Sequence, residues 1–173
     1  MYGDRPPVVL ENDNLELAEK AFQEYGSDFA THEKSSFSSL TKPKEHMGEL
    51  MSQASVMLHE HGFKFTTDRY HVERHWMSSE EGVDHPPFEW HIDDGGPVNY
   101  NTVAALFYVK KDEILEGGNL LWNTRECSDG NETLIPIKTG SIVLIEGNVP
   151  HCPQGIKGVG ERKLIAIFYK SLR

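Results

Sequence analysis

The sequence contains few cysteines and no long apolar run. Its 173 residues include only two cysteines, Cys127 and Cys152. These are too few and too widely spaced for a disulfide framework or a paired-cysteine zinc site, so we expect two free thiols. No segment reaches the apolar length that a membrane-spanning helix needs. The start MYGDRPPVVL lacks the basic and apolar stretches of a secretory signal, and we therefore expect a cytoplasmic protein that does not bind membranes.

Positive charge is also scarce. The chain has 17 Lys and Arg residues against 27 Asp and Glu residues, which gives a formal net charge of −10. Nucleic-acid-binding modules concentrate Lys and Arg to displace the counterions of phosphates, so a nucleic-acid partner is not expected. We expect instead a peptide, protein or small-molecule substrate, bound by a monomer or a weak homodimer.

Internal repeats, low-complexity tracts and an obvious interdomain linker are absent from the sequence. A chain of this length can bury a core without crosslinks. We therefore expect a single domain over residues 1–173, with a helical N-terminal part over about 1–62 and a β core over about 63–173.

Two segments of the N-terminal part have the apolar spacing of helices. NDNLELAEKAFQEYG predicts a helix capped by Asp13, with Glu16 completing a capping box and Gly26 at its end. EHMGELMSQASVMLHEHG predicts a second helix that ends at Gly62. Its expected buried stripe consists of Met47, Leu50, Met51, Ala54 and Leu58. The polar, serine-rich stretch between the helices, SDFATHEKSSFSSLTK, is expected to be a loop.

From Phe63 onward the sequence changes to short segments rich in β-branched and aromatic residues, separated by Gly, Asp, Asn and Pro. The expected strands are FKFTTDRYHVERHW, TVAALFYVK, GNLLWN, TLIPI, SIVLIE and KLIAIFYK. Helices followed by many short strands indicate a mainly β, α+β fold. We expect a sandwich or barrel-like β core with the helices packed on one side.

The stretch EWHIDDGG places His91 and Asp93 on the same face of a strand that ends in a turn. By itself, such a pair is typical of a strand end whose polar groups are satisfied by the turn. His151, in GNVPHCPQG, follows the SIVLIE strand and supplies a third ligand. Two histidines and one carboxylate on one face of a metal leave the opposite positions open, as in non-haem Fe(II) oxygenases. Asp94 is the alternative acid if the strand ends early.

Arg162 begins the last apolar strand. In an extended chain it shares a face with Leu164, Ala166 and Phe168, whereas Lys163 points to the other side. An arginine on the inner face of an apolar strand is costly unless it meets an anion, and its fork matches a carboxylate. The alternatives are a solvent-exposed Arg162 at the strand start, or Lys163 as the anion-binding residue.

These motifs resemble the Fe(II)- and 2-oxoglutarate-dependent dioxygenases over about Phe63 to Tyr169. That family carries HxD…H as its iron ligands and a basic residue on the next strand. TVAALFYVKKDEILEGGNLLW and TGSIVLIEGNVPH look like segments of its prolyl 4-hydroxylase branch. The spacing to Arg162 is slightly longer than in many relatives, so we expect a bulge or a wider turn in KGVG.

The resemblance implies a double-stranded β-helix and assigns roles to five residues. His91, Asp93 and His151 would hold Fe(II), Arg162 would bind the distal carboxylate of 2-oxoglutarate, and Tyr108 would donate its hydroxyl to the same carboxylate. For Tyr108, plain core packing is the alternative. The implied cofactors are Fe(II), 2-oxoglutarate as co-substrate, O2, and ascorbate as an accessory reductant.

The implied reaction is hydroxylation of an unactivated C–H bond with release of succinate and CO2. A prolyl residue of a protein or peptide is the first expected substrate, and a free amino acid or another small molecule is the alternative. A different class of protein also fits the ligand set. In that class, a non-catalytic, cupin-like β-barrel would use the same residues to hold zinc or manganese and would bind a small ligand.

Three further residues and two loops complete the expected site. In several members of the resembled family the first strand of the β core contributes to the pocket, which makes Tyr70, Arg74 and His75 candidates. For each of them, burial in the core or simple exposure to solvent is the alternative. MSSEEGVDHPPFEW and the serine-rich SDFATHEKSSFSSLTK are expected to form a lid.

Overall fold

The computed structural model describes residues 1–25, 34–38, 41–79, 84, 87–96 and 98–173. The helices are α1 (Leu15–Gln23) and α2 (Glu45–Glu60). The strands are β1 (Val8–Glu11), β2 (Lys34–Ser38), β3 (Phe65–Ser79), β4 (Thr102–Lys111), β5 (Glu116–Gly117), β6 (Leu120–Trp122), β7 (Thr133–Ile135), β8 (Ser141–Glu146), β9 (His151–Pro153), β10 (Ile156–Lys157) and β11 (Gly160–Ser171). The predicted mainly β fold is confirmed.

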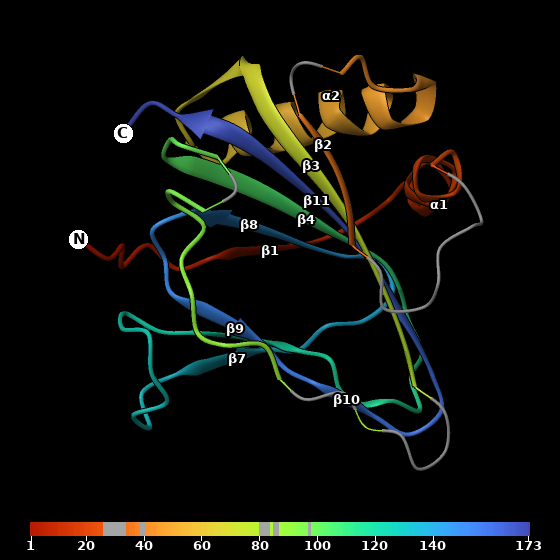
Figure 1. The fold of residues 1–173 in the computed structure, drawn as a ribbon, viewed down its shortest axis with the longest axis vertical. Helices are drawn as coiled ribbons and strands as arrows, with labels where there is room; N and C mark the ends of the chain where they lie inside the picture. The colour runs from red at the N-terminus through yellow and green to blue at the C-terminus, as the bar shows by residue number, and fades with distance from the viewer. Residues whose placement is uncertain (26–33, 39–40, 80–83, 85–86, 97) are drawn as a thin grey trace.

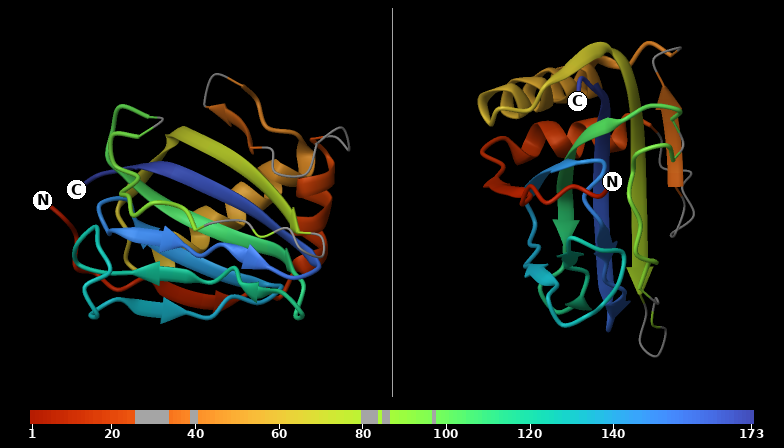
Figure 2. Two further views of the ribbon diagram at one scale, coloured as in Figure 1. Left: turned by 60° about the horizontal axis from the view of Figure 1, so that its bottom comes forward. Right: turned by 90° about the vertical axis from the view of Figure 1, so that its left-hand side faces the viewer.

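The strands form a large antiparallel sheet of order β1-β8-β4-β11-β3-β2 and a smaller sheet of order β7-β6-β9. β10 and β5 form a separate two-stranded sheet. The helices lie on one side of the large sheet, and β7 and β9 lie on the other (Figure 1). In the left view of Figure 2 the helices are behind the large sheet. The expected packing of both helices on one side of the β core is therefore correct.

Alternation along the central strands separates two apolar layers. On β11, Ile165 and Ile167 pack toward the helices, whereas Leu164, Ala166 and Phe168 pack toward the small sheet. The residues of β4 and β8 divide in the same way. The two central strands of the large sheet, β4 and β11, are buried on both faces, because the helices cover one face and the small sheet covers the other. The space between the sheets is where a ligand site can form.

The helix α2 agrees with its sequence pattern. All five residues of the predicted stripe are buried. The helix is followed by Gly62, whose φ of 79° lies in the left-handed region that glycine adopts without a Cβ penalty. In α1 the predicted cap is wrong, because Asn14 and not Asp13 accepts a hydrogen bond from the Leu17 amide. Glu16 pairs with Lys20 and takes no part in a capping box.

Five strands were not predicted, namely β1, β2 and the short strands β5, β9 and β10. β1 pairs with β8 from Val8↔Leu144 onward, although its segment follows a proline-rich start. β2 lies within the serine-rich stretch that was expected to be a loop, and it pairs with β3. Half of the residues of the expected lid, 27–33, 39–40, 80–83 and 85–86, lie outside the described residues.

Neither helix in the described ranges is long and apolar enough to cross a membrane. Cys127 and Cys152 are free thiols. Cys152 is buried on β9, and its Sγ donates to the carbonyl of Phe88 at 2.9 Å.

Glu24 at the end of α1 caps the N-terminus of α2. Its carboxylate accepts hydrogen bonds from the amides of His46 at 2.9 Å and Met47 at 3.0 Å. The N-cap residue Lys44 makes no side-chain capping bond of its own. Glu24→Ala is therefore expected to lower the free energy of unfolding by about 1–2 kcal/mol in denaturant titrations, because two amides lose their acceptor. Glu49→Ala, on the exposed side of the same helix, is the matched control and should change it by less than about 0.5 kcal/mol.

Candidate metal and co-substrate site

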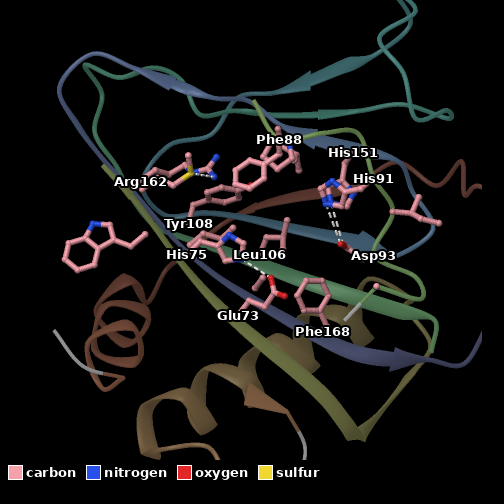
Figure 3. Close-up of a pocket in the computed structure, with 18 residues that line it drawn as sticks. Glu73, His75, Phe88, His91, Asp93, Leu106, Tyr108, His151, Arg162 and Phe168 are labelled. Carbon is pink, nitrogen blue, oxygen red and sulfur yellow. Dashed lines mark hydrogen bonds and ion pairs between the residues drawn. The ribbon is translucent and has the colours of Figure 1, made fainter. Parts of the chain in front are cut away.

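His91, Asp93 and His151 converge between the sheets. Their ligand atoms lie within 4.8 Å of one another. The Nε2 atoms of His91 and His151 approach the two oxygens of Asp93, at 3.7 Å and 3.6 Å. The backbones of the two histidines exchange hydrogen bonds, each N···O distance being 3.0 Å, so the segment at His91 adds to the edge of β9. Figure 3 shows the side chains on one wall of a cavity.

The other ring nitrogens orient both imidazoles. Nδ1 of His91 contacts the carbonyl of Glu89 at 2.8 Å, and Nδ1 of His151 contacts the carbonyl of Val149 at 3.0 Å. A carbonyl accepts only from a protonated nitrogen, so each Nδ1 donates and the Nε2 lone pairs remain for a ligand. Burial lowers the pKa of His151, which favours the neutral, metal-binding form of its ring. The donor set therefore fits a divalent metal held by two imidazoles and one carboxylate.

Asp94 points away from this cluster. Its carboxylate accepts from the amide of Thr102 at 2.8 Å and from Nη2 of Arg173 at 3.0 Å. The amides of Asp93 and Asp94 both donate to the carbonyl of Gly147. Asp93, and not the alternative Asp94, is thus the acid that faces both histidines.

Arg162 lies in the same cavity, with only 2% of its surface exposed. Nη1 donates to the carbonyl of Gly118 at 3.3 Å and Nη2 contacts Sδ of Met77 at 3.3 Å, while Nε has no hydrogen-bond partner. Within the described ranges no carboxylate lies within ion-pair distance of the guanidinium. Burial lowers the pKa of Arg162. A buried cation of this kind is expected to receive an anion.

Lys163, the alternative anion-binding residue, does not line the cavity. Its Nζ lies over the ring of Trp76, 4.5 Å from the centroid, on the helix side of the large sheet. The chain reaches Arg162 through β10 and a turn in which Gly158 and Gly160 have positive φ. The pairing of β11 with β4 shifts register between Lys163 and Leu164. A turn therefore lies within KGVG, as expected, whereas the register shift lies beyond that segment.

The segment Glu116-Gly117-Gly118 packs beside Arg162. Gly117 has a φ of 77°, and a Cβ there would lie 2.2 Å from the carbonyl oxygen of Gly155. A Cβ on Gly118 would lie 3.7 Å from Cδ of Arg162 and 3.1 Å from Cε of Lys111. Glycine is therefore required for β5 and β10 to approach each other here.

Tyr108 is the neighbour of Arg162 in the cavity. Its side chain is buried, and its ring centroid lies 6.0 Å from Cζ of Arg162. Burial raises the pKa of Tyr108, so the phenol stays protonated and can donate a hydrogen bond. The structure thus places Tyr108 in the cavity wall, although the same ring also packs in the apolar layer.

Comparison with known families and with curated proteins finds no match to this chain. Solved structures do match. A Pseudomonas putida prolyl-4-hydroxylase superposes with a TM-score of 0.64 at 13% identity, covering 98% of this chain and 95% of that one. HygX from Streptomyces hygroscopicus, with nickel and 2-oxoglutarate bound, gives 0.64 at 11% identity over 96% and 83%. The collagen prolyl hydroxylase of Paramecium Bursaria Chlorella virus-1 gives 0.54 at 15% identity over 96% of each chain.

The chain has the fold of the 2-oxoglutarate- and Fe(II)-dependent oxygenases. The predicted double-stranded β-helix is confirmed, and so is the predicted resemblance at the level of the fold. The roles of the individual residues stay predictions, supported by the positions described above.

The cavity of this oxygenase fold has a volume of about 370 Å³. Apart from the triad and Arg162, its walls are mostly apolar and aromatic. Prominent among them are Phe88, Leu106, Leu120, Leu164 and Phe168. Such walls exclude water from whatever binds between them.

Of the three further candidates, only His75 lines the cavity. Tyr70 and Arg74 face the other side of β3. The hydroxyl of Tyr70 donates to the carbonyl of Thr41, and Arg74 donates to the carbonyls of Phe22 and Tyr25. Neither residue lines the cavity, because alternation along β3 turns both side chains away from it.

One cavity residue, Glu73, was missed. It is buried and forms part of the cavity wall. It shares the inner face of β3 with His71, His75 and Met77, and this alternation is the signal that could have found it. An acid flanked by two histidines at a spacing of two was visible in YHVERHW.

Proposed function

We propose that this protein is an Fe(II)- and 2-oxoglutarate-dependent dioxygenase that hydroxylates an unactivated C–H bond and releases succinate and CO2. The observation that carries the proposal is the combination, in one cavity, of the His91, Asp93 and His151 cluster with the buried Arg162. The three candidate metal ligands alone would be compatible with many classes of metalloprotein. The buried guanidinium of Arg162 makes only two long contacts, so an anionic co-substrate would supply the hydrogen-bond acceptors that it lacks.

Each residue has a distinct task in this reaction. His91, Asp93 and His151 would hold Fe(II), which when bound supplies the oxidation chemistry. Their carbonyl contacts at Glu89 and Val149 keep the rings in position without the metal's help.

Arg162 would bind the distal carboxylate of 2-oxoglutarate through its fork, and Tyr108 would donate to the same group. The apolar walls keep bulk water from the co-substrate and fix its orientation.

A prolyl residue in a peptide or protein is the first proposed substrate. Prolyl hydroxylases occur among the structures that share this fold, and the strand motifs of the sequence resemble their branch. A free amino acid or another small molecule is the alternative. We place the protein in the cytoplasm, with ascorbate as the accessory reductant.

Uncoupled turnover tests the proposal directly. Protein purified without oxygen and supplied with Fe(II), ascorbate and 2-oxoglutarate should form succinate when air is admitted, even without a substrate. Omission of Fe(II), or its replacement by Zn(II), is the matched control and should abolish succinate. If Fe(II) binds in a metal titration and no succinate appears, the protein is a non-catalytic, metal-binding barrel and the proposal is wrong.

A peptide screen tests the prolyl assignment separately. Proline-containing peptides incubated under turnover conditions should gain the mass of one oxygen on the proline. The same mass gain on a free amino acid, with none on any peptide, would transfer the activity to the alternative substrate class.

Tyr108→Phe tests the second co-substrate contact. Removal of the hydroxyl is expected to raise the Kd for 2-oxoglutarate by about 3- to 10-fold, the usual value of one hydrogen bond. Isothermal titration of the Ni(II)-loaded protein measures it without turnover. An unchanged Kd would assign Tyr108 to core packing only.

A further inference from the structure

The guanidinium of Arg162 has a thioether as its side-chain hydrogen-bond partner within the described part of the chain. Nη2 lies 3.3 Å from Sδ of Met77, a contact drawn at Arg162 in Figure 3. Nη1 donates to the carbonyl of Gly118 at 3.3 Å, and Nε has no partner. A thioether sulfur is a weak hydrogen-bond acceptor. A charged donor in the cavity is therefore matched with a weak acceptor.

Met77 lies on the inner face of β3, beside Arg162. The two residues are register partners in the pairing of β3 with β11, and both line the cavity. Only 8% of the surface of Met77 is exposed, and the side chain shares a small apolar cluster with Leu115 and Ile156. Its sulfur is thus shielded from bulk solvent, but it borders the space of about 370 Å³ that small solutes can occupy.

The other four methionines have different surroundings. Met47 and Met51 are buried in the apolar layer on the helix side, and Met57 packs against that layer. Met1 is exposed. None of these four lines the cavity. Met77 is therefore the methionine at which a change in the chemistry of the sulfur would act on Arg162.

We propose that Met77 is a site of oxidation by a hydroperoxide, and that its oxidation state determines how tightly Arg162 binds the anionic co-substrate. In this step the O–O bond of hydrogen peroxide breaks and one oxygen forms a bond to Sδ, which loses two electrons. The second oxygen leaves as water with both hydrogens of the peroxide, and the thioether becomes a sulfoxide. The proposal rests on the proposed function, because it concerns the binding of 2-oxoglutarate at the same site.

Oxidation changes the partner that Met77 offers to Arg162. A sulfoxide is polar, and its oxygen accepts a hydrogen bond that a thioether sulfur accepts only weakly. An oxygen on Sδ lies within reach of the guanidinium, because the sulfur itself is already 3.3 Å from Nη2. It therefore competes with the distal carboxylate of 2-oxoglutarate for the same donor, and it adds an atom to the wall of the cavity. The metal ligands are other residues, so metal binding should not change.

The test follows Met77 oxidation and co-substrate binding in the same samples. Metal-free protein is treated with hydrogen peroxide for increasing times, freed of peroxide, and reduced with a thiol to restore Cys127 and Cys152. Peptide mapping by mass spectrometry gives the fraction of sulfoxide at each methionine. Isothermal titration of the Ni(II)-loaded protein then gives the Kd for 2-oxoglutarate. Full oxidation of Met77 is expected to raise this Kd about 10-fold, the value of one hydrogen bond to a charged group.

The native protein alone shows which methionine is responsible. The fraction of protein that binds with the original Kd should fall in step with the fraction of Met77 sulfoxide, and not with the sulfoxide at Met1 or Met57. Protein that is treated with peroxide in the presence of Ni(II) and 2-oxoglutarate should form the Met77 sulfoxide more slowly, because the co-substrate then fills the space beside the sulfur.

Two variants give a matched comparison, in which each protein is measured before and after peroxide. Met77→Leu keeps an apolar side chain of similar size and cannot be oxidised, so peroxide should leave its Kd unchanged. Met57→Leu is the control. Met57 is a partly buried methionine of α2 on the helix side of the large sheet, so its loss should leave the response to peroxide intact.

Complete oxidation of Met77 with an unchanged Kd would overturn the proposal, and so would a rise in Kd that persists in Met77→Leu. It would also be overturned if Met77 stayed a thioether at a dose that fully oxidises Met57. The first and third outcomes are read from the native protein, so they do not depend on a variant that folds. Failure of the untreated protein to bind 2-oxoglutarate would refute the oxygenase proposal as well, whereas native binding that is unaffected by oxidised Met77 would refute this inference alone.

Discussion

Arg162→Met is expected to raise the Kd for 2-oxoglutarate by about 100- to 1000-fold. Methionine keeps much of the length of the side chain and removes the charge and the fork, so the distal carboxylate would be buried without a partner. Isothermal titration with Ni(II)-loaded protein gives the Kd directly. Lys163→Met is the control, because Lys163 lies on the other face of the strand over Trp76 and should not change the Kd.

The same substitution separates binding from folding. In the protein without 2-oxoglutarate, Arg162 is a buried cation with a weak contact to Gly118 and an unsatisfied Nε. Replacing it by an apolar side chain should therefore leave the free energy of unfolding unchanged or raise it by about 1–2 kcal/mol. A large drop in stability, with the co-substrate still bound at the native Kd, would show that Arg162 is a structural residue and would contradict the clamp.

Asp93→Ala is expected to weaken metal binding by more than about 100-fold and to abolish succinate formation. Removal of a residue that only orients a metal ligand by a hydrogen bond already weakens metal binding by about 10- to 100-fold. Asp93→Ala removes a proposed ligand itself. Metal content after gel filtration and a Mn(II) titration measure the effect.

Asp94→Ala is the paired control for this prediction. It removes a neighbouring carboxylate that contacts Thr102 and Arg173, so it should cost stability and retain the metal. Retention of metal by Asp93→Ala, with loss in Asp94→Ala, would reverse the assignment of the acid.

The features that the sequence predicted depend on periodicity and chain order. The stripe of α2 and the alternation of β11 follow from spacing alone, and both agree with the structure. His91, Asp93 and His151 could be proposed as a group because a resemblance supplied the order of strands that brings them together. The same alternation predicts that Arg162 lies on the inner face of β11, and the structure places it in the cavity.

The features that were missed depend on partners far away in the sequence. β1 and β2 are strands because they pair with β8 and β3, and their own sequences do not predict strand structure. The capping of α2 by Glu24 requires the packing of two helices. Glu73 escaped notice because an acid in a strand is ordinarily solvent-exposed, and only the opposing sheet makes this one part of a cavity wall.

The reciprocal amide contacts between His91 and His151 have a consequence for how the centre is loaded and emptied. In zinc fingers the ion supplies the folding energy, and chelators denature the domain. Here the main chain aligns both imidazoles by itself, so the ion enters a frame that is already assembled. If Fe(II) binds there as proposed, we expect it to be removed and restored reversibly without unfolding of the chain.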